Sequence, residues 1–127
     1  MHYQAKEFSS IILVNQGGKF ERQHLPTEAQ FSTVNGMVIK DYDGDGKKDI
    51  LLAGNQFDTE VETTPADASI GLLLIRKEGK FIPQSVLNSG VFLKGNVRDL
   101  QKINVNGQDM ILVANNNSNI QILAKRN

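Results

Sequence analysis

Short runs of apolar and β-branched residues, separated by Gly, Asn and Asp, recur along the whole chain. Each run has the length of a strand, and no window keeps the apolar spacing of an amphipathic helix beyond a few turns. The run Ile-Leu-Leu-Ala at 50–53 is apolar at every position, which predicts a strand covered on both faces. The runs at 19–25 and 80–87 are more polar, which is typical of outer edge strands. The pattern predicts an all-β fold.

The chain also repeats itself at a distance of about 60 residues. Segment 11–25 matches 72–87, with Gly-Lys-Phe in both, and segment 48–55 matches 108–116. Repeats of this length indicate a modular architecture. Each repeat contains four runs of strand length, and the third of these runs occurs three times along the chain. The sequence therefore predicts one whole unit between two partial ones.

Units of four antiparallel strands with apolar inner strands are typical of β-propeller blades. We expect a single propeller-like domain or fragment over 1–127, with a partial blade at 8–27, a complete blade at 33–88 and a partial blade at 95–125. A closed propeller needs at least about four blades, so about two blades' worth of strands predicts an incomplete propeller. Apolar faces open at both ends would favour self-association, and we therefore expect a homo-oligomer.

The composition excludes several classes of function. Lys plus Arg equals Asp plus Glu at 14 each, and this balance argues against a nucleic-acid partner. No apolar run is long enough for membrane insertion, and the absence of cysteine excludes disulfides, thiolate metal sites and cysteine nucleophiles. No signal peptide is evident at the start of the sequence, so the compartment stays open. His2 and His24 are isolated, without the spacing of a catalytic triad or a zinc site. We therefore expect the protein to have no enzymatic activity.

The stretch KDYDGDGKKDILLAGN, residues 40–55, concentrates acidic residues between two predicted strands. Its spacing, D-x-D-x-D-G-x-x-D, suits a hard cation such as Ca²⁺, which takes six to eight oxygen ligands. Gly46 allows a sharp turn among the acids. Without a cation these carboxylates would repel one another, by about 1 kcal/mol per pair 4 Å apart in water and by more where solvent is excluded. The predicted ligands are the side chains of Asp41, Asp43, Asp45 and Asp49 and the carbonyl of Lys47.

Other interpretations of this loop are an EF-hand, a solvated turn and a catalytic aspartate cluster. An EF-hand needs flanking helices and a glutamate at the twelfth loop position, where this chain has Leu52 between predicted strands. Asp-Gly pairs are also common in plain hairpin turns. The matching loop of the second repeat, 102–109, is shorter and uses a simple Asn-Gly turn. Because a plain turn suffices there, we expect the four acids to have an additional role.

A second acidic loop, 55–69, is long for a hairpin connection. Long loops on rigid scaffolds often bind ligands, although a solvated acidic loop is the plainer interpretation. Its candidate residues for a ligand or partner surface are Asp58, Glu60, Glu62 and Asp67. The phenylalanines are expected to pack between blades rather than to stack on sugars, and these are Phe20, Phe31, Phe81 and Phe92.

The motifs VNGMVIKDYDGDGKKDILLAGN, DASIGLLLIRKEGKF and GQDMILVANNN resemble the FG-GAP or VCBS repeat family, which carries integrin-α-like calcium hairpins. The similarity covers most of the chain from about residue 28, and these segments resemble the C-terminal blades of bacterial VCBS-repeat proteins. It implies a β-propeller and calcium ligands at the five positions named above.

The resemblance also implies a non-enzymatic module that binds or scaffolds a protein or carbohydrate ligand. It implies secretion or display at the cell surface if the chain is a fragment of a longer family member. The alternative is a fragment of a propeller lyase or hydrolase whose active site lies mostly outside this chain.

Overall fold

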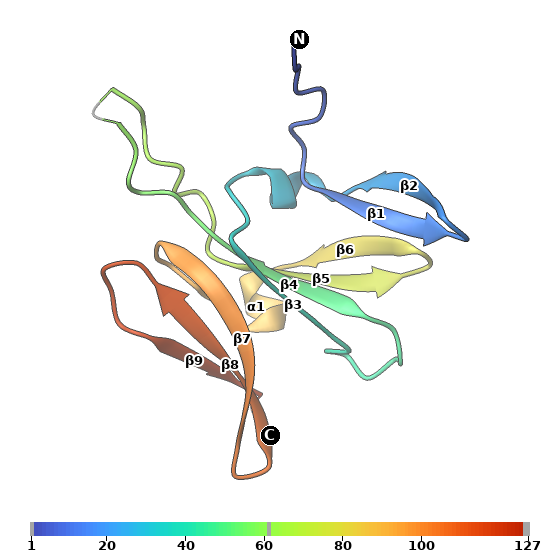
Figure 1. The fold of residues 1–127 in the computed structure, drawn as a ribbon. Helices are drawn as coiled ribbons and strands as arrows, with labels where there is room; N and C mark the ends of the chain where they lie inside the picture. The colour runs from blue at the N-terminus through green and yellow to red at the C-terminus, as the bar shows by residue number, and fades with distance from the viewer. Residues whose placement is uncertain (1, 61, 126–127) are drawn as a thin grey trace.

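The computed structural model describes residues 2–60 and 62–125, and their strands form three antiparallel sheets (Figure 1). The first sheet pairs β1 (Ile11–Gln16) with β2 (Lys19–His24). The middle sheet has the order β3 (Gly36–Lys40), β4 (Asp49–Ala53), β5 (Leu72–Lys77) and β6 (Lys80–Gln84). The third has the order β7 (Val97–Val105), β8 (Gln108–Asn115) and β9 (Gln121–Ala124). The helical segments are η1 (Thr27–Gln30) and α1 (Val86–Ser89), so the predicted all-β fold is confirmed.

The middle sheet has a core on each of its two faces. Every residue of β4 is buried, as the unbroken apolar run predicted. Leu51 and Leu73 belong to the core between the middle and third sheets. Ile50 and Leu74 belong to a second core, which η1 and Ile12 of the first sheet help to cover. Because neighbouring residues of a strand point to opposite faces, one strand serves both cores.

The sequence repeat is also a repeat of strand pairing. Lys40 pairs with Asp49 beside the turn of the middle sheet, and Asn104 pairs with Asp109 beside the turn of the third sheet. The next pairing repeats as well, since Leu52 lies opposite Leu72 and Leu112 lies opposite Ile122. The two sheets therefore share one register, although the turn between their first two strands differs in length.

The middle and third sheets meet through equivalent faces. Leu51 and its counterpart Ile111 both lie in the core between them. A plain blade-on-blade repeat would bring opposite faces together, as the first and middle sheets do through Ile12 and Leu74. The outer face of the third sheet is therefore the counterpart of the middle-sheet face that the first sheet covers. The propeller arrangement itself stays a prediction.

Strands β3 and β7 lie close together where the middle and third sheets join. A Cβ at Gly36 would stand 2.8 Å from the backbone nitrogen of Leu100, so only glycine allows this approach. Further along, the Lys102 ammonium donates a hydrogen bond to the Ile39 carbonyl at 2.7 Å. These contacts fix the third sheet against the first strand of the middle sheet.

Two details differ from the sequence predictions. Phe81 packs beside the core, but Phe20, Phe31 and Phe92 are 65%, 58% and 56% exposed, so the expectation that they pack between sheets is wrong. Phe20 lies on the two-stranded first sheet, whose outer face no described element covers. In addition, β5 begins at Leu72, although the apolar run extends back to residue 68, because loop contacts hold the preceding residues. Within 2–60 and 62–125, no helix is long and apolar enough to span a membrane.

Candidate metal-binding site

The acidic hairpin 41–48 connects β3 to β4 at one end of the middle sheet, and loop 55–69 extends from the opposite end (Figure 1). The two sets of acidic residues predicted from the sequence are therefore separated by the length of the strands. They form two separate features rather than one site.

The carboxylate of Asp41 organises the turn of the hairpin. It accepts hydrogen bonds from the backbone N–H groups of Gly44 at 2.6 Å and Gly46 at 2.8 Å. Both glycines have left-handed backbone angles, with φ of 85° and 83°, which residues with a side chain rarely adopt. The chain therefore wraps around Asp41, and the two glycines make this winding possible.

Asp49, the first residue of β4, anchors the other side of the hairpin. Its side chain is fully buried. One carboxylate oxygen accepts a hydrogen bond from the Tyr42 backbone N–H, and the other accepts one from the Arg76 backbone N–H on β5, both at 2.8 Å. A buried carboxylate is stable only when it is paired or hydrogen-bonded, and these two bonds supply part of that support. Asp49 thus ties the hairpin to the interior of the sheet.

The structure brings three of the predicted ligands together. Asp41, Asp43 and Asp49 each offer a carboxylate oxygen, and these oxygens all lie within 4.8 Å of one another. Oxygens bound to a common Ca²⁺ at about 2.3–2.6 Å would be separated by no more than about 5 Å. The donor atoms are all oxygen, which suits a hard cation. The residues present therefore fit a calcium ion in both donor type and spacing.

Asp45 is not one of these three grouped carboxylates. It accepts hydrogen bonds from the Lys47 backbone N–H at 2.8 Å and from the Lys47 ammonium at 3.0 Å. The backbone N–H of Lys47, together with its side chain, lowers the pKa of Asp45 below its ordinary value. Asp45 already has a cationic neighbour, so a metal ion would have to displace or share it. The ligand roles of Asp45 and of the Lys47 carbonyl stay predictions.

The matching hairpin of the third sheet has a shorter, plain turn. Its turn, Asn106-Gly107, follows the pair formed by Asn104 and Asp109. Asp109 is exposed and accepts hydrogen bonds from Asn104 at 3.0 Å and Lys40 at 3.2 Å. The hydrogen bond from Asn104, followed by that from Lys40, lowers the pKa of Asp109. Asp49 and Asp109 occupy equivalent positions, but among the residues that the structure describes Asp109 belongs to no cluster of acids that could hold a metal ion.

Tyr42 lies within the acidic hairpin and packs against the core between the middle and third sheets. Its hydroxyl is buried and finds no hydrogen-bond partner among the described residues. Burial, and secondarily the negative charge of Asp49, raise the pKa of Tyr42 to about 12. The phenol is therefore held in its neutral form in the folded protein.

This raised pKa predicts a specific alkaline instability. A tyrosine ionises near pH 10 in the unfolded chain and near pH 12 in the folded one, so its contribution to stability is complete below pH 10 and is lost as the pH rises to 12. Urea melts between pH 9 and 12 should show a smaller alkaline loss for Tyr42→Phe than for the wild type. In a Tyr3→Phe variant, where Tyr42 is the remaining tyrosine, absorbance at 295 nm should titrate near pH 12. A midpoint near pH 10 would contradict the burial of this hydroxyl.

In the second acidic loop, the carboxylate of Asp58 is engaged by the third sheet. One oxygen accepts hydrogen bonds from Asn96 at 3.1 Å, from Arg98 at 3.1 Å and from Asn116 at 2.7 Å. Sequence reasoning did not identify these donors, because they lie 38 to 58 residues away and form no motif. Asp58 therefore fastens the loop to the third sheet. Glu60, Glu62 and Asp67 are exposed, and their role in binding a ligand or partner stays a prediction.

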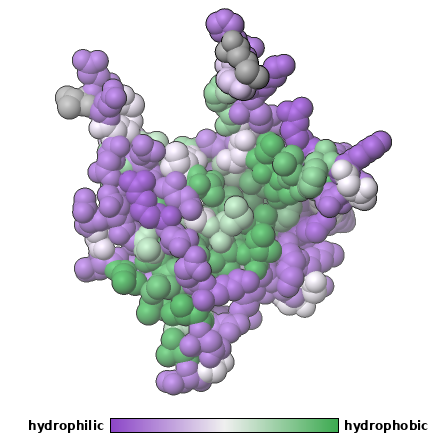
Figure 2. Space-filling view, in the orientation of Figure 1, coloured by the Kyte–Doolittle hydropathy of each residue, from purple (hydrophilic) through white to green (hydrophobic). Residues whose placement is uncertain are grey.

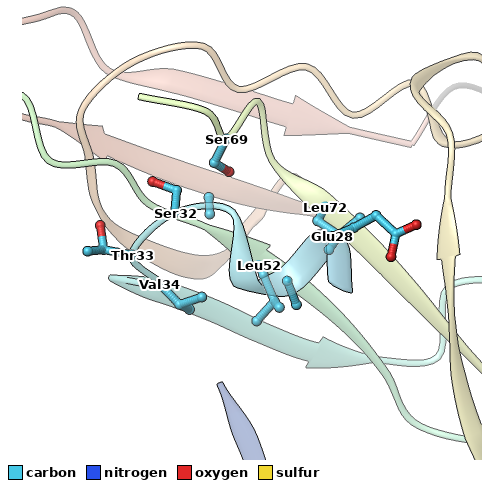
Figure 3. A pocket seen from close by; sticks show the side chains of 9 residues that line it. Glu28, Ser32, Thr33, Val34, Leu52, Ser69 and Leu72 are labelled. Atoms are coloured by element: carbon cyan, nitrogen blue, oxygen red, sulfur yellow. The ribbon is translucent and has the colours of Figure 1, made fainter. Parts of the chain in front are cut away.

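Two hollows border the middle sheet. A cavity of about 20 Å³ lies between η1 and the middle sheet, large enough for about one water molecule (Figure 3). It is lined in part by Ser32, Leu52 and Ser69. An open groove of about 550 Å³ runs between β3 and β7. Its charged residues, Asp99 and Lys102, are already hydrogen-bonded to neighbouring protein groups, so they do not converge on a common point.

Comparisons of the chain with protein-family models, with curated proteins and with solved structures found no match. The interpretation of the hairpin therefore depends on its residues and geometry.

Proposed function

We propose that the chain is a non-enzymatic, calcium-binding β-repeat module of the propeller type, in which one Ca²⁺ braces the β3–β4 hairpin. The observation that carries this proposal is the convergence of Asp41, Asp43 and Asp49 within 4.8 Å of one another. Repulsion among three carboxylates at this spacing favours an open hairpin, and a divalent cation reverses that preference. The ion would supply positive charge and would hold the hairpin closed.

The contacts of Asp49 support a structural role for the ion. Asp49 is hydrogen-bonded to Arg76 on β5, while Asp41 and Asp43 lie in the turn. An ion bound by all three would therefore connect the turn to the second and third strands of the middle sheet. The rigid end of this sheet would then present neighbouring loops to a protein or carbohydrate ligand, as the resemblance to the FG-GAP and VCBS repeats implies.

Calcium binding can be tested by calorimetric titration of the metal-stripped chain. We expect one ion per chain for the wild type and a loss of affinity of at least about tenfold for Asp43→Ala, because one of the grouped carboxylates is removed. Asp43 suits this test because it is exposed and accepts a 3.2 Å hydrogen bond from the backbone N–H of Asp45, a weaker attachment than that of Asp41 or Asp49. Calcium at about 100 times its Kd should also stabilise the fold by about 2.7 kcal/mol.

The matched control is Asp109→Ala in the equivalent hairpin, which should bind calcium as the wild type does. A wild-type chain that takes up no calcium would overturn the proposal. So would an Asp43→Ala variant that binds with unchanged affinity.

A further inference from the structure

The outer face of the third sheet is apolar, and no described strand or helix packs over it. Residues on this face alternate with those that contact the middle sheet, such as Ile111. The apolar members are Ile103 and Val105 on β7, Met110 and Leu112 on β8, and Ile122 on β9. They form a continuous surface, because Ile103 pairs with Met110 and Leu112 pairs with Ile122.

This face carries little charge. Its other members in the paired strands are Asp99, Gln101, Gln108, Ala114 and Ala124. The charged member, Asp99, lies at one end of the face, where its carboxylate accepts hydrogen bonds from the Leu100 backbone N–H and from the Gln101 side chain. On a sheet face that is in contact with water, the outward residues are normally polar. Ile122 is nevertheless 56% exposed and Val105 is 42% exposed. Green apolar residues reach the surface over the middle and third sheets (Figure 2).

On the middle sheet, the equivalent face is buried. The counterparts of Met110 and Leu112 are Ile50 and Leu52, which are 6% and 4% exposed. The first sheet and η1 cover them in the second core. On the third sheet, no described element takes that place. The sequence has apolar residues at equivalent positions on both faces, but among residues 2–60 and 62–125 only the face of the middle sheet is covered.

The total accessible surface of the chain is larger than that of a compact monomer of the same mass. The chain exposes 9257 Å², whereas a compact monomer of 14.0 kDa exposes about 6,700 Å². Part of the excess of about 2,500 Å² belongs to the N-terminal segment and to loop 55–69, which extend away from the sheets (Figure 1). A third of it would equal the about 800 Å² that each partner buries in a standard interface. The chain therefore has enough excess surface for a dimer.

We propose that the outer face of the third sheet is a homodimer interface, occupied by the same face of a second copy. The formal net charge of zero means that two copies meet without overall electrostatic repulsion. A twofold axis lets one self-complementary patch serve both copies and closes the assembly at two. Packing sheet on sheet would bury both apolar faces, in the same manner as the middle and third sheets pack within the chain.

Sedimentation velocity of the chain from about 1 to 100 μM tests this interface. The wild type should approach twice the monomer mass, and Ile122→Glu should sediment as a monomer, because it places a charge inside the apolar contact. Ile122→Ala should dimerise with a dissociation constant at least about tenfold higher, and it introduces no charge that could disturb folding. Far-UV circular dichroism checks that each variant keeps its strand content.

The matched control is Met37→Glu, because Met37 is 57% exposed and lies on the middle sheet. We expect this variant to remain dimeric. A wild-type chain that stays monomeric throughout the concentration range would overturn the proposal. Dimers that survive Ile122→Glu, or that are lost with Met37→Glu instead, would also overturn it.

Discussion

Replacing Asp49 with alanine should lower the free energy of unfolding by about 3 kcal/mol or more, even when calcium is removed with EDTA. The side chain is fully buried, and it accepts hydrogen bonds from the backbone N–H groups of Tyr42 and Arg76. Alanine would leave both donors without this partner inside the protein. Urea denaturation monitored by circular dichroism gives the change in free energy directly.

Two aspartates serve as controls for this prediction. In EDTA, Asp43→Ala and Asp109→Ala should each change the free energy of unfolding by no more than about 0.5 kcal/mol, because both residues are exposed. In saturating calcium, Asp43→Ala should also lose the stabilisation that the ion supplies. If Asp49→Ala cost no more than Asp109→Ala in EDTA, the anchoring role of Asp49 would be wrong.

Replacing Asn55 with alanine should cost about 3 kcal/mol, because this side chain joins three separate segments. It is 2% exposed. Its amide nitrogen donates to the carbonyls of Ser69 and Gly95, both at 2.8 Å. Its side-chain oxygen accepts from the Ser32 hydroxyl and from the Ser69 backbone N–H. Alanine would remove all four hydrogen bonds and leave a space beside buried polar groups.

Asn88→Ala is the comparison, since Asn88 is exposed at the surface of α1. Its effect should stay within about 0.5 kcal/mol. Hydrogen exchange adds a local measurement, because Asn55→Ala should increase exchange at Ser69. Equal stability losses for Asn55→Ala and Asn88→Ala would show that the junction contributes little.

The sequence predicted the features that depend on local pattern. Strand-length apolar runs gave the all-β class, and the fully apolar run of β4 predicted its burial on both faces. The internal repeat anticipated the common register of the middle and third sheets. These features follow from hydrophobic periodicity and turn residues, which are encoded within about ten consecutive positions.

The grouping of three of the predicted aspartates was foreseeable from the sequence, but the surroundings of each one were not. The spacing of the aspartates indicated a convergent cluster, and the structure groups Asp41, Asp43 and Asp49. The sequence could not distinguish buried Asp49 from Asp45, which interacts with Lys47. That distinction depends on where β5 lies, since Arg76 supplies a backbone partner from a strand that is distant in sequence.

Contacts between distant loops left no signal in the sequence. The polar junction of Asn55 and the three donors around Asp58 join segments separated by 14 to 58 residues. Asn and Asp residues in loops are ordinarily interpreted as turn formers, and that interpretation concealed these contacts. Packing, rather than local sequence, also decides which face of the third sheet contacts the middle sheet and which face lies outside. The exposed Phe20 and Phe92 show the same limit.

Because the two hairpins share one register, the acidic turn and the plain turn are structurally interchangeable. Residues 41–48 connect the pair of Lys40 and Asp49, and residues 105–108 complete the shorter hairpin beyond Asn104 and Asp109, with the flanking strands aligned alike. An insertion or deletion of a few residues at this turn can therefore add or remove the acidic loop without shifting a strand. If the acidic turn binds calcium as proposed, repeats of this kind would gain or lose sensitivity to calcium one unit at a time, while the scaffold around them stays the same.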